Sequence, residues 1–198
     1  MFYAAILAGG LSSRMGEDKA GLYLQGQTLL QRAEDLLETA GAELVLVSGR
    51  AAGYRGVPDL TPHCGPPGAL YSLIDHIRQH YGLDGSPLVL VPVDMPLLTA
   101  AAVHQLVDAA VNAECCHYEG ELFPCVLKAT PDLYTHLRDL FTDGTELGGR
   151  RSMRAITNFY GAKEVPLGTL DPAQFSNVNT PQEWQAVLAG VGAAPRLG

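Results

Sequence analysis

Short continuous apolar runs alternate with stretches of helical periodicity in the first half of the chain. The apolar runs are Tyr3–Leu7, Leu44–Val47 and Leu88–Val93, and each has the length of a strand. Such runs predict strands that are buried on both faces, as in a parallel sheet. Between them, apolar residues recur every three or four positions over 29–40 and 69–77, which predicts helices. This alternation predicts an α/β fold with right-handed crossovers.

Helix-start signals place further elements. Thr28 with Gln31, and Thr180 with Glu183, have capping-box spacing, and Thr99 precedes another helical stripe. Thr130-Pro131 is typical of a cap followed by the first helical residue. These signals predict helices that begin at each of the four threonines.

The second half is less regular. We expect two strands over residues 115–118 and 122–127, and an edge strand over 162–166. We also expect a short helix from Arg150 towards Phe159. Pro and Gly between 59 and 68 predict a loop. The order of the strands in this half does not follow from the pattern.

Size and charge restrict the class of protein. A chain of 198 residues with 47% hydrophobic content predicts one domain over residues 1–190, followed by a flexible Gly/Ala-rich tail over 191–198. The net charge of −8 argues against nucleic-acid or membrane binding, since both need a basic face. The sequence shows no secretory signal and no membrane-length apolar run, so we expect a cytoplasmic protein.

Four cysteines lack zinc or redox spacing and are interpreted as reduced thiols, mostly in the core. The alternative is that Cys64, in the turn 62–68, faces a ligand. The chain gives no nucleophile or metal-ligand pattern for its histidines.

The loop after the first predicted strand carries the clearest chemical signal. It holds Gly9, Gly10 and Gly16 together with Arg14 and Lys19. Glycine lets backbone N–H groups approach an oxyanion, and the two side chains add positive charge. The spacing fits neither the Walker A loop nor the dinucleotide fingerprint. The loop therefore predicts a phosphate site of another type.

Residues 7–20 resemble the signature Leu-Ala-Gly-Gly-x-Ser-x-Arg-Met-Gly-x-Asp-Lys-Ala of the molybdenum cofactor guanylyltransferase family, and match every specified position. The resemblance implies a single three-layer domain of nucleotidyltransferase type, with a mostly parallel, Rossmann-like sheet and helices on both faces. It also implies that nucleotide-binding residues include Leu7, Ala8, Gly9 and Gly10, and that Arg14 and Lys19 hold the triphosphate.

Asp94 follows the third apolar run directly, in Val93-Asp94-Met95-Pro96. Because parallel strands bring their carboxyl ends to one edge, Lys19 and Asp94 can meet although they are far apart in sequence. The resemblance implies that Asp94 binds nucleotide and Mg²⁺ and acts in catalysis, whereas alone it could equally cap a turn. Magnesium favours such sites, with few carboxylates plus substrate phosphates.

Other segments resemble the family less closely. Gly65–Leu70 resembles its nucleotide-packing segment, which makes Asp59 a nucleotide-binding candidate or a solvated loop residue. Asn177 and Asn179, in Asn-x-Asn-x-Pro, are pterin-binding candidates or parts of a helix-entry turn. Gly49 stands where the family usually has an Asn that helps to read the base. Three arginines (Arg150, Arg151 and Arg154) could meet the pterin phosphate or form a solvated face.

The resemblance implies transfer of GMP from GTP to the terminal phosphate of molybdopterin, with release of pyrophosphate. It also makes molybdoenzymes or their chaperones candidates for transient contact. Two alternatives remain open. One is a related nucleotidyltransferase that uses CTP or a sugar phosphate, which the departure at Gly49 motivates. The other is a non-catalytic, nucleotide-binding cofactor chaperone.

Overall fold

The computed structural model describes residues 1–9, 18–50, 55–142 and 151–192. A seven-stranded sheet forms its centre, with the strand order β5-β4-β1-β6-β8-β7-β9. The strands are β1 Tyr3–Leu7, β4 Leu44–Ser48, β5 Gly56–Val57, β6 Pro87–Pro92, β7 Cys115–Tyr118, β8 Cys125–Lys128 and β9 Lys163–Val165. A separate hairpin pairs β2 Tyr23–Leu24 with β3 Gln27–Thr28.

The first half of the sheet is parallel, as predicted. β5, β4, β1 and β6 pair in parallel, whereas β8 is antiparallel to both β6 and β7. β9 then pairs in parallel with β7 and forms the edge that the sequence predicts. The sheet is therefore mostly parallel, with its exceptions in the half whose order the sequence left open.

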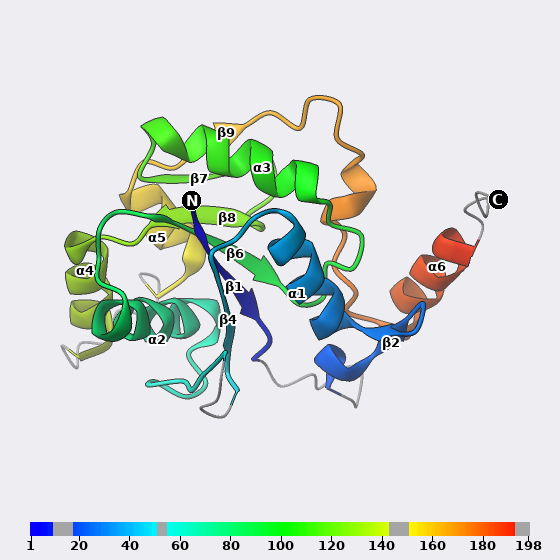
Figure 1. Ribbon diagram of the computed structural model, residues 1–198, viewed down its shortest axis with the longest axis horizontal. Coiled ribbons are helices and arrows are strands. Elements are labelled where there is room, and N and C mark those ends of the chain that lie inside the picture. The colour runs from blue at the N-terminus through cyan, green and yellow to red at the C-terminus, as the bar shows by residue number, and fades with distance from the viewer. Residues whose placement is uncertain (10–17, 51–54, 143–150, 193–198) are drawn as a thin grey trace.

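Helices cover both faces of the sheet (Figure 1). They are α1 Leu29–Thr39, α2 Gly65–His80, α3 Ala100–Ala109, α4 Pro131–Thr142, α5 Met153–Phe159 and α6 Pro181–Gly192. Alternate strand residues separate two cores: Ala4 and Ile6 pack with α1 and α3, and Ala5 and Leu7 pack with α2, α4 and α5. The prediction of one three-layer domain is confirmed.

The boundaries correct the sequence prediction in three places. The loop predicted over 59–68 ends early, because α2 already begins at Gly65, and Pro66 and Pro67 lie in its first turn, where a missing N–H is harmless. The strand predicted over 122–127 begins only at Cys125, after Pro124, which cannot donate to the ladder. The short helix predicted from Arg150 begins at Met153 with Ser152 as its cap.

The capping predictions are confirmed at Thr28, Thr99, Thr130 and Thr180, whose hydroxyl groups each accept a backbone N–H from the following turn. The predicted tail begins inside α6, which continues to Gly192, and residues 193–198 lie outside the described residues. Within the described part of the chain, no helix has the length and apolar character needed to cross a membrane.

Candidate functional site

The carboxyl ends of β1, β4 and β6 meet at one rim of the sheet. Leu7 at the end of β1 pairs in register with Ser48 of β4 and with Pro92 of β6. The backbone N–H of Val93 then donates to the Leu7 carbonyl at 3.2 Å. The segment that carries Asp94 therefore leaves the sheet beside the start of the glycine loop, as the parallel topology predicted.

Lys19 reaches this rim from a short 3-10 helix, Lys19–Gly21, which Asp18 caps through its Oδ1 atom. The second Asp18 oxygen accepts a hydrogen bond from Arg50 Nη2 at 2.8 Å. Buried Ala20 packs into the core next to them. Asp18 and Arg50 thus tie the Lys19 turn to the segment that follows β4.

Three segments converge at the Lys19 ammonium group. Lys19 Nζ donates to Asp94 Oδ2 and to Asn179 Oδ1, both at 2.7 Å, across 75 and 160 positions of sequence. The side chains of Lys19 and Asp94 are only 16% and 18% exposed. The Asp94 carbonyl also accepts the N–H of Val178 at 2.9 Å. The prediction that Lys19 and Asp94 meet is confirmed, and residues 177–179 join them.

Glu183, in the first turn of α6, fixes the Asn179 segment. Its Oε2 atom accepts the backbone N–H groups of Asn179 and Thr180 at 2.6 and 2.9 Å. These hydrogen bonds lower the pKa of the Glu183 carboxyl, and the one from the Asn179 backbone has the largest effect. The helix cap therefore also holds Asn179 against Lys19.

A cavity of about 300 Å³ opens around these groups. Its lining includes the backbone of the β1 end, the Lys19–Asp94 pair and the two asparagines: Leu7, Ala8, Gly9, Asp18, Lys19, Pro66, Pro92, Val93, Asp94, Phe123, Asn177 and Asn179. One carboxylate and two amide oxygens suit a cation that completes its shell with phosphate and water, as Mg²⁺ does. No group of three or more His, Cys, Asp and Glu side chains suited to a metal occurs within the described ranges.

A second cavity, of about 470 Å³, shares Leu7, Gly9 and Pro66 with the first. Ser48, Gly49 and Asp59 line its other side. Partial burial raises the pKa of the Asp59 carboxyl, and the charge of His63 opposes this shift. The hydroxyl oxygen of buried Ser48 has no hydrogen-bond partner among the described residues. This cavity therefore offers the Asp59 carboxylate to a ligand, with the buried Ser48 hydroxyl group behind its wall.

Gly49 has a φ of +70°, and a Cβ placed on it would lie 2.8 Å from the Gly9 Cα and 3.7 Å from Asp59 Oδ2. Two reasons thus require glycine at this position: the left-handed backbone and the close approach of the β1 and β4 ends. The asparagine side chain that the family usually has here would not fit. The neighbouring side chains at this place are those of Ser48 and Asp59.

A third, open groove of about 1040 Å³ lies between α6 and the rest of the site. Asn177 and Asn179 line this groove as well as the Lys19–Asp94 cavity. Its other walls come from the β2–β3 turn, the segment after β6 and one face of α6, which projects from the sheet in Figure 1. The rim thus offers three connected spaces around one ion pair.

Comparison with known proteins decides the family. A family model described as the MobA-like NTP transferase domain matches residues 4–162. The molybdenum cofactor guanylyltransferase of Xanthomonas euvesicatoria is 37% identical over 183 residues, which cover 92% of either chain. That of Rhizobium meliloti is 33% identical over 204 residues, covering 91% of this chain and 87% of the relative. The chain belongs to the molybdenum cofactor guanylyltransferase family.

Solved structures show the same fold. The molybdopterin-guanine dinucleotide biosynthesis protein A of Archaeoglobus fulgidus superposes with a TM-score of 0.72 at 17% identity, covering 96% of this chain and 99% of that one. The 2-C-methyl-D-erythritol 4-phosphate cytidylyltransferase of Thermus thermophilus gives 0.65 at 16% identity, covering 97% and 99%. The fold is thus shared with a molybdopterin-guanine dinucleotide biosynthesis protein and with a cytidylyltransferase.

The predicted site residues of this guanylyltransferase family member separate into three groups. Leu7, Ala8, Gly9, Lys19, Asp94, Asn177 and Asn179 line one cavity, and Asp59 lines its neighbour. Gly10, Arg14 and Arg150 lie outside the described residues. Arg151 donates to the Leu140 carbonyl at 2.9 Å and lies over the Phe141 ring. Cys64 packs against Gly68 at the start of α2.

Sequence reasoning missed Asp18, Arg50 and Ser48. Asp18 is a specified position of the family signature, so a role for it could have been predicted. Its pairing with Arg50 could not, because nothing in the sequence links these two residues, which are 32 positions apart. Ser48 ends an apolar strand and gave no signal of its own.

Proposed function

We propose that this guanylyltransferase family member transfers GMP from GTP to the terminal phosphate of molybdopterin, using Lys19, Asp94 and the cavity around them. The supporting observation is the Lys19–Asp94–Asn179 cluster at the strand rim. A phosphate oxygen of the acceptor attacks the α-phosphorus of GTP, the bond from that phosphorus to the β-phosphate oxygen breaks, and pyrophosphate leaves. The acceptor is already a nucleophile, so the protein has to align two anions and stabilise charge.

Asp94, with the amide oxygens of Asn177 and Asn179 nearby, would hold Mg²⁺ together with the triphosphate. The ion supplies charge neutralisation on the phosphates when it is bound. Lys19 pairs with Asp94 as its counter-ion. On nucleotide binding, the Lys19 ammonium turns to the phosphates and stabilises the departing pyrophosphate, and Arg14 joins it from the glycine loop.

The cavity beside Gly49 suits the guanine base. Guanine presents two adjacent N–H donors on its Watson–Crick edge, and a carboxylate such as Asp59 can accept both. Cytosine has an acceptor nitrogen at the corresponding place, which a carboxylate repels. This arrangement favours GTP over the CTP alternative.

The open groove along α6 suits the molybdopterin acceptor. It adjoins the triphosphate cavity through Asn177 and Asn179, whose amides can bind a pterin or its phosphate. We further propose that the reaction takes place in the cytoplasm, where molybdoenzymes or their chaperones would contact the protein transiently.

Pyrophosphate release from purified protein with Mg²⁺, molybdopterin and either GTP or CTP tests the proposal. We expect kcat/KM for GTP to exceed that for CTP at least a hundredfold. Equal or better use of CTP would establish the cytidylyl alternative. Binding of Mg-GTP by calorimetry without pyrophosphate release would establish the non-catalytic chaperone. Turnover with a sugar phosphate in place of molybdopterin would identify a different acceptor.

A further inference from the structure

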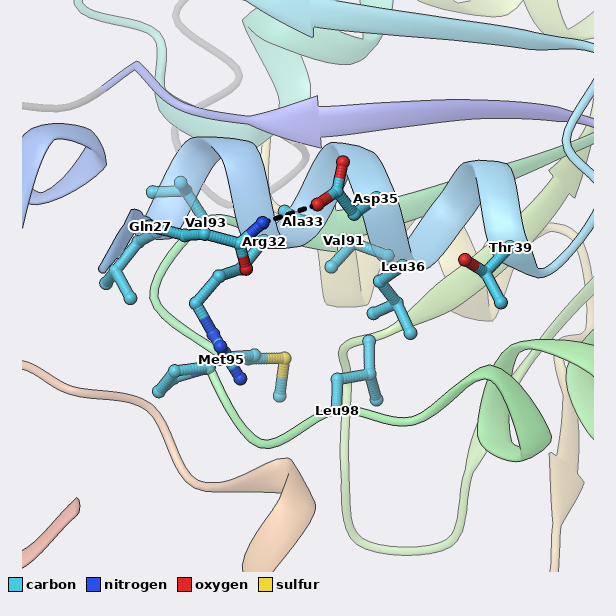
Figure 2. A pocket seen from close by; sticks show the side chains of 12 residues that line it. Gln27, Arg32, Ala33, Asp35, Leu36, Thr39, Val91, Val93, Met95 and Leu98 are labelled. Carbon is cyan, nitrogen blue, oxygen red and sulfur yellow. Dashed lines mark hydrogen bonds between the residues drawn. The ribbon is translucent and has the colours of Figure 1, made fainter. Parts of the chain in front are cut away.

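A separate cavity of about 260 Å³ lies on the other side of the segment that carries Asp94. It opens between α1 and residues 91–98, as Figure 2 shows. Its walls are mainly apolar and come from Leu29, Ala33, Leu36, Val91, Val93, Met95, Pro96 and Leu98. No step of the proposed reaction uses this space.

Arg32 of α1 extends into the cavity without a partner among the described residues. Its Nε atom is buried and makes no hydrogen bond. In Figure 2 the Arg32 side chain runs towards Met95, away from Asp35. A buried guanidinium N–H without an acceptor is unfavourable, so such a group favours an anion that can reach it.

The carboxylates of α1 near Arg32 are engaged elsewhere. Asp35 accepts a hydrogen bond from Gln27 Nε2 at 2.7 Å, the dashed line in Figure 2. Glu34 and Glu38 both pair with Arg55. The acidic side chains of α1 therefore bind other residues, and the Arg32 guanidinium is available to an anionic ligand.

From this charge and these walls, we propose that the cavity binds a small monocarboxylate that carries a compact apolar group. The guanidinium fork matches a carboxylate in a bidentate pair. The small volume and the side chains of Leu36, Val93 and Met95 suit a group the size of a phenyl ring or a branched alkyl chain. Asp35 lines the same cavity, and its charge disfavours a dianion such as a phosphate monoester.

The cavity adjoins the proposed catalytic site. Val93 and Met95, on either side of Asp94 in the chain, line this cavity, whereas Asp94 faces Lys19 in the other. A ligand beside Arg32 thus contacts the two neighbours of the proposed magnesium ligand.

Phenylacetate is a suitable probe, and phenylacetamide is its uncharged counterpart of nearly the same shape. In an NMR titration of ¹⁵N-labelled protein, we expect phenylacetate to give saturable shifts centred on Arg32, Leu36, Val93 and Met95. The dissociation constant should be about millimolar, as befits a fragment of this size. Phenylacetamide should bind at least tenfold more weakly.

The variant Arg32→Gln should weaken phenylacetate binding at least tenfold. Arg138→Gln, which removes an exposed arginine that pairs with the adjacent Asp139, should leave it unchanged. Absence of saturable shifts in the wild-type protein up to tens of millimolar would overturn the proposal, as would equal binding of acid and amide. The wild-type comparison decides the question even if Arg32→Gln folds poorly.

Discussion

Most of the contacts that place Lys19 come from residues far from it in sequence. Arg50 holds its turn through the neighbouring Asp18, while Asp94 and Asn179 hold its ammonium group. An ion pair that is less than a fifth exposed keeps more of its strength than a surface pair. The same geometry leaves two acceptors ready for a cation when the ammonium moves to a phosphate.

Lys19→Ala should reduce kcat roughly a hundredfold or more while changing the affinity for Mg-GTP much less, because its charge matters most as pyrophosphate departs. Steady-state pyrophosphate release and calorimetry separate the two quantities. Lys128→Ala, at the far end of β8 and paired with Glu114, is the matched control. A normal kcat in Lys19→Ala would make Lys19 a structural residue only.

Asp59 gives the site a dependence on pH. Since partial burial raises the pKa of this carboxyl, it takes up a proton at higher pH than an ordinary aspartate. The ionised form, which is the one proposed to accept hydrogen bonds from guanine, prevails above that pKa and is lost as the pH falls through it. The KM for GTP should therefore rise in mildly acidic solution.

Asp59→Asn should remove this acid limb and raise the KM for GTP by about ten- to a hundredfold, the usual range for a hydrogen bond to a charged group, with kcat little affected. Inosine triphosphate, which lacks the 2-amino group, provides a second readout. Wild-type protein should prefer GTP over it, and the variant should not. A preference that survives in Asp59→Asn would remove Asp59 from base recognition.

Hydrophobic periodicity and helix-cap residues were enough to predict most helices and the central strands. The strands β1, β4 and β6, their helices, and the shared rim of Lys19 and Asp94 all follow from local pattern and parallel topology. The order β8-β7-β9 does not, because β8 is antiparallel to both of its neighbours and the crossover rule governs only parallel connections. The role of Gly49 was also hidden, since neither its positive φ nor its contact with Gly9 can be recognised from one sequence.

Gly49→Ala should lower the free energy of unfolding by about 2–4 kcal/mol, because it adds a backbone clash at Gly9 to the strain of a left-handed alanine. Gly26→Ala has a similar φ of +86° but no atom within 4 Å of its Cβ, and should lose only about 1–2 kcal/mol. Urea titrations measure both. Equal losses would show that the approach of β1 to β4 imposes no steric requirement.

At the scale of the whole molecule, the two cores explain the cysteines. Cys115, Cys116 and Cys125 lie on β7 and β8 and are buried, whereas Cys64 is partly exposed at the start of α2. Burial raises the pKa of Cys115 to about 12 and of Cys116 to about 11, and that of Cys125 well above its usual value. The interpretation of the cysteines as mostly core thiols is confirmed for these three.

Iodoacetamide at pH 8 should therefore label Cys64 alone in the native protein and all four cysteines after denaturation, because the reactive species is the exposed thiolate. Mass spectrometry of tryptic peptides gives the pattern. Rapid native labelling of Cys116 or Cys125 would mean that the sheet opens far more readily than its buried strands indicate.

Asp94→Asn tests whether one distant carboxylate and one lysine act on the same magnesium–triphosphate. The measurement is pyrophosphate release from GTP and molybdopterin as a function of Mg²⁺ concentration, with urea unfolding to verify the fold. Asp84→Asn, in the loop before the opposite end of β6, serves as the control. We predict that Asp94→Asn loses roughly a thousandfold in turnover at saturating Mg²⁺ while remaining folded, and that the control keeps full activity. If Asp94→Asn kept the turnover and the magnesium dependence of the wild-type protein, Asp94 would not be the magnesium ligand.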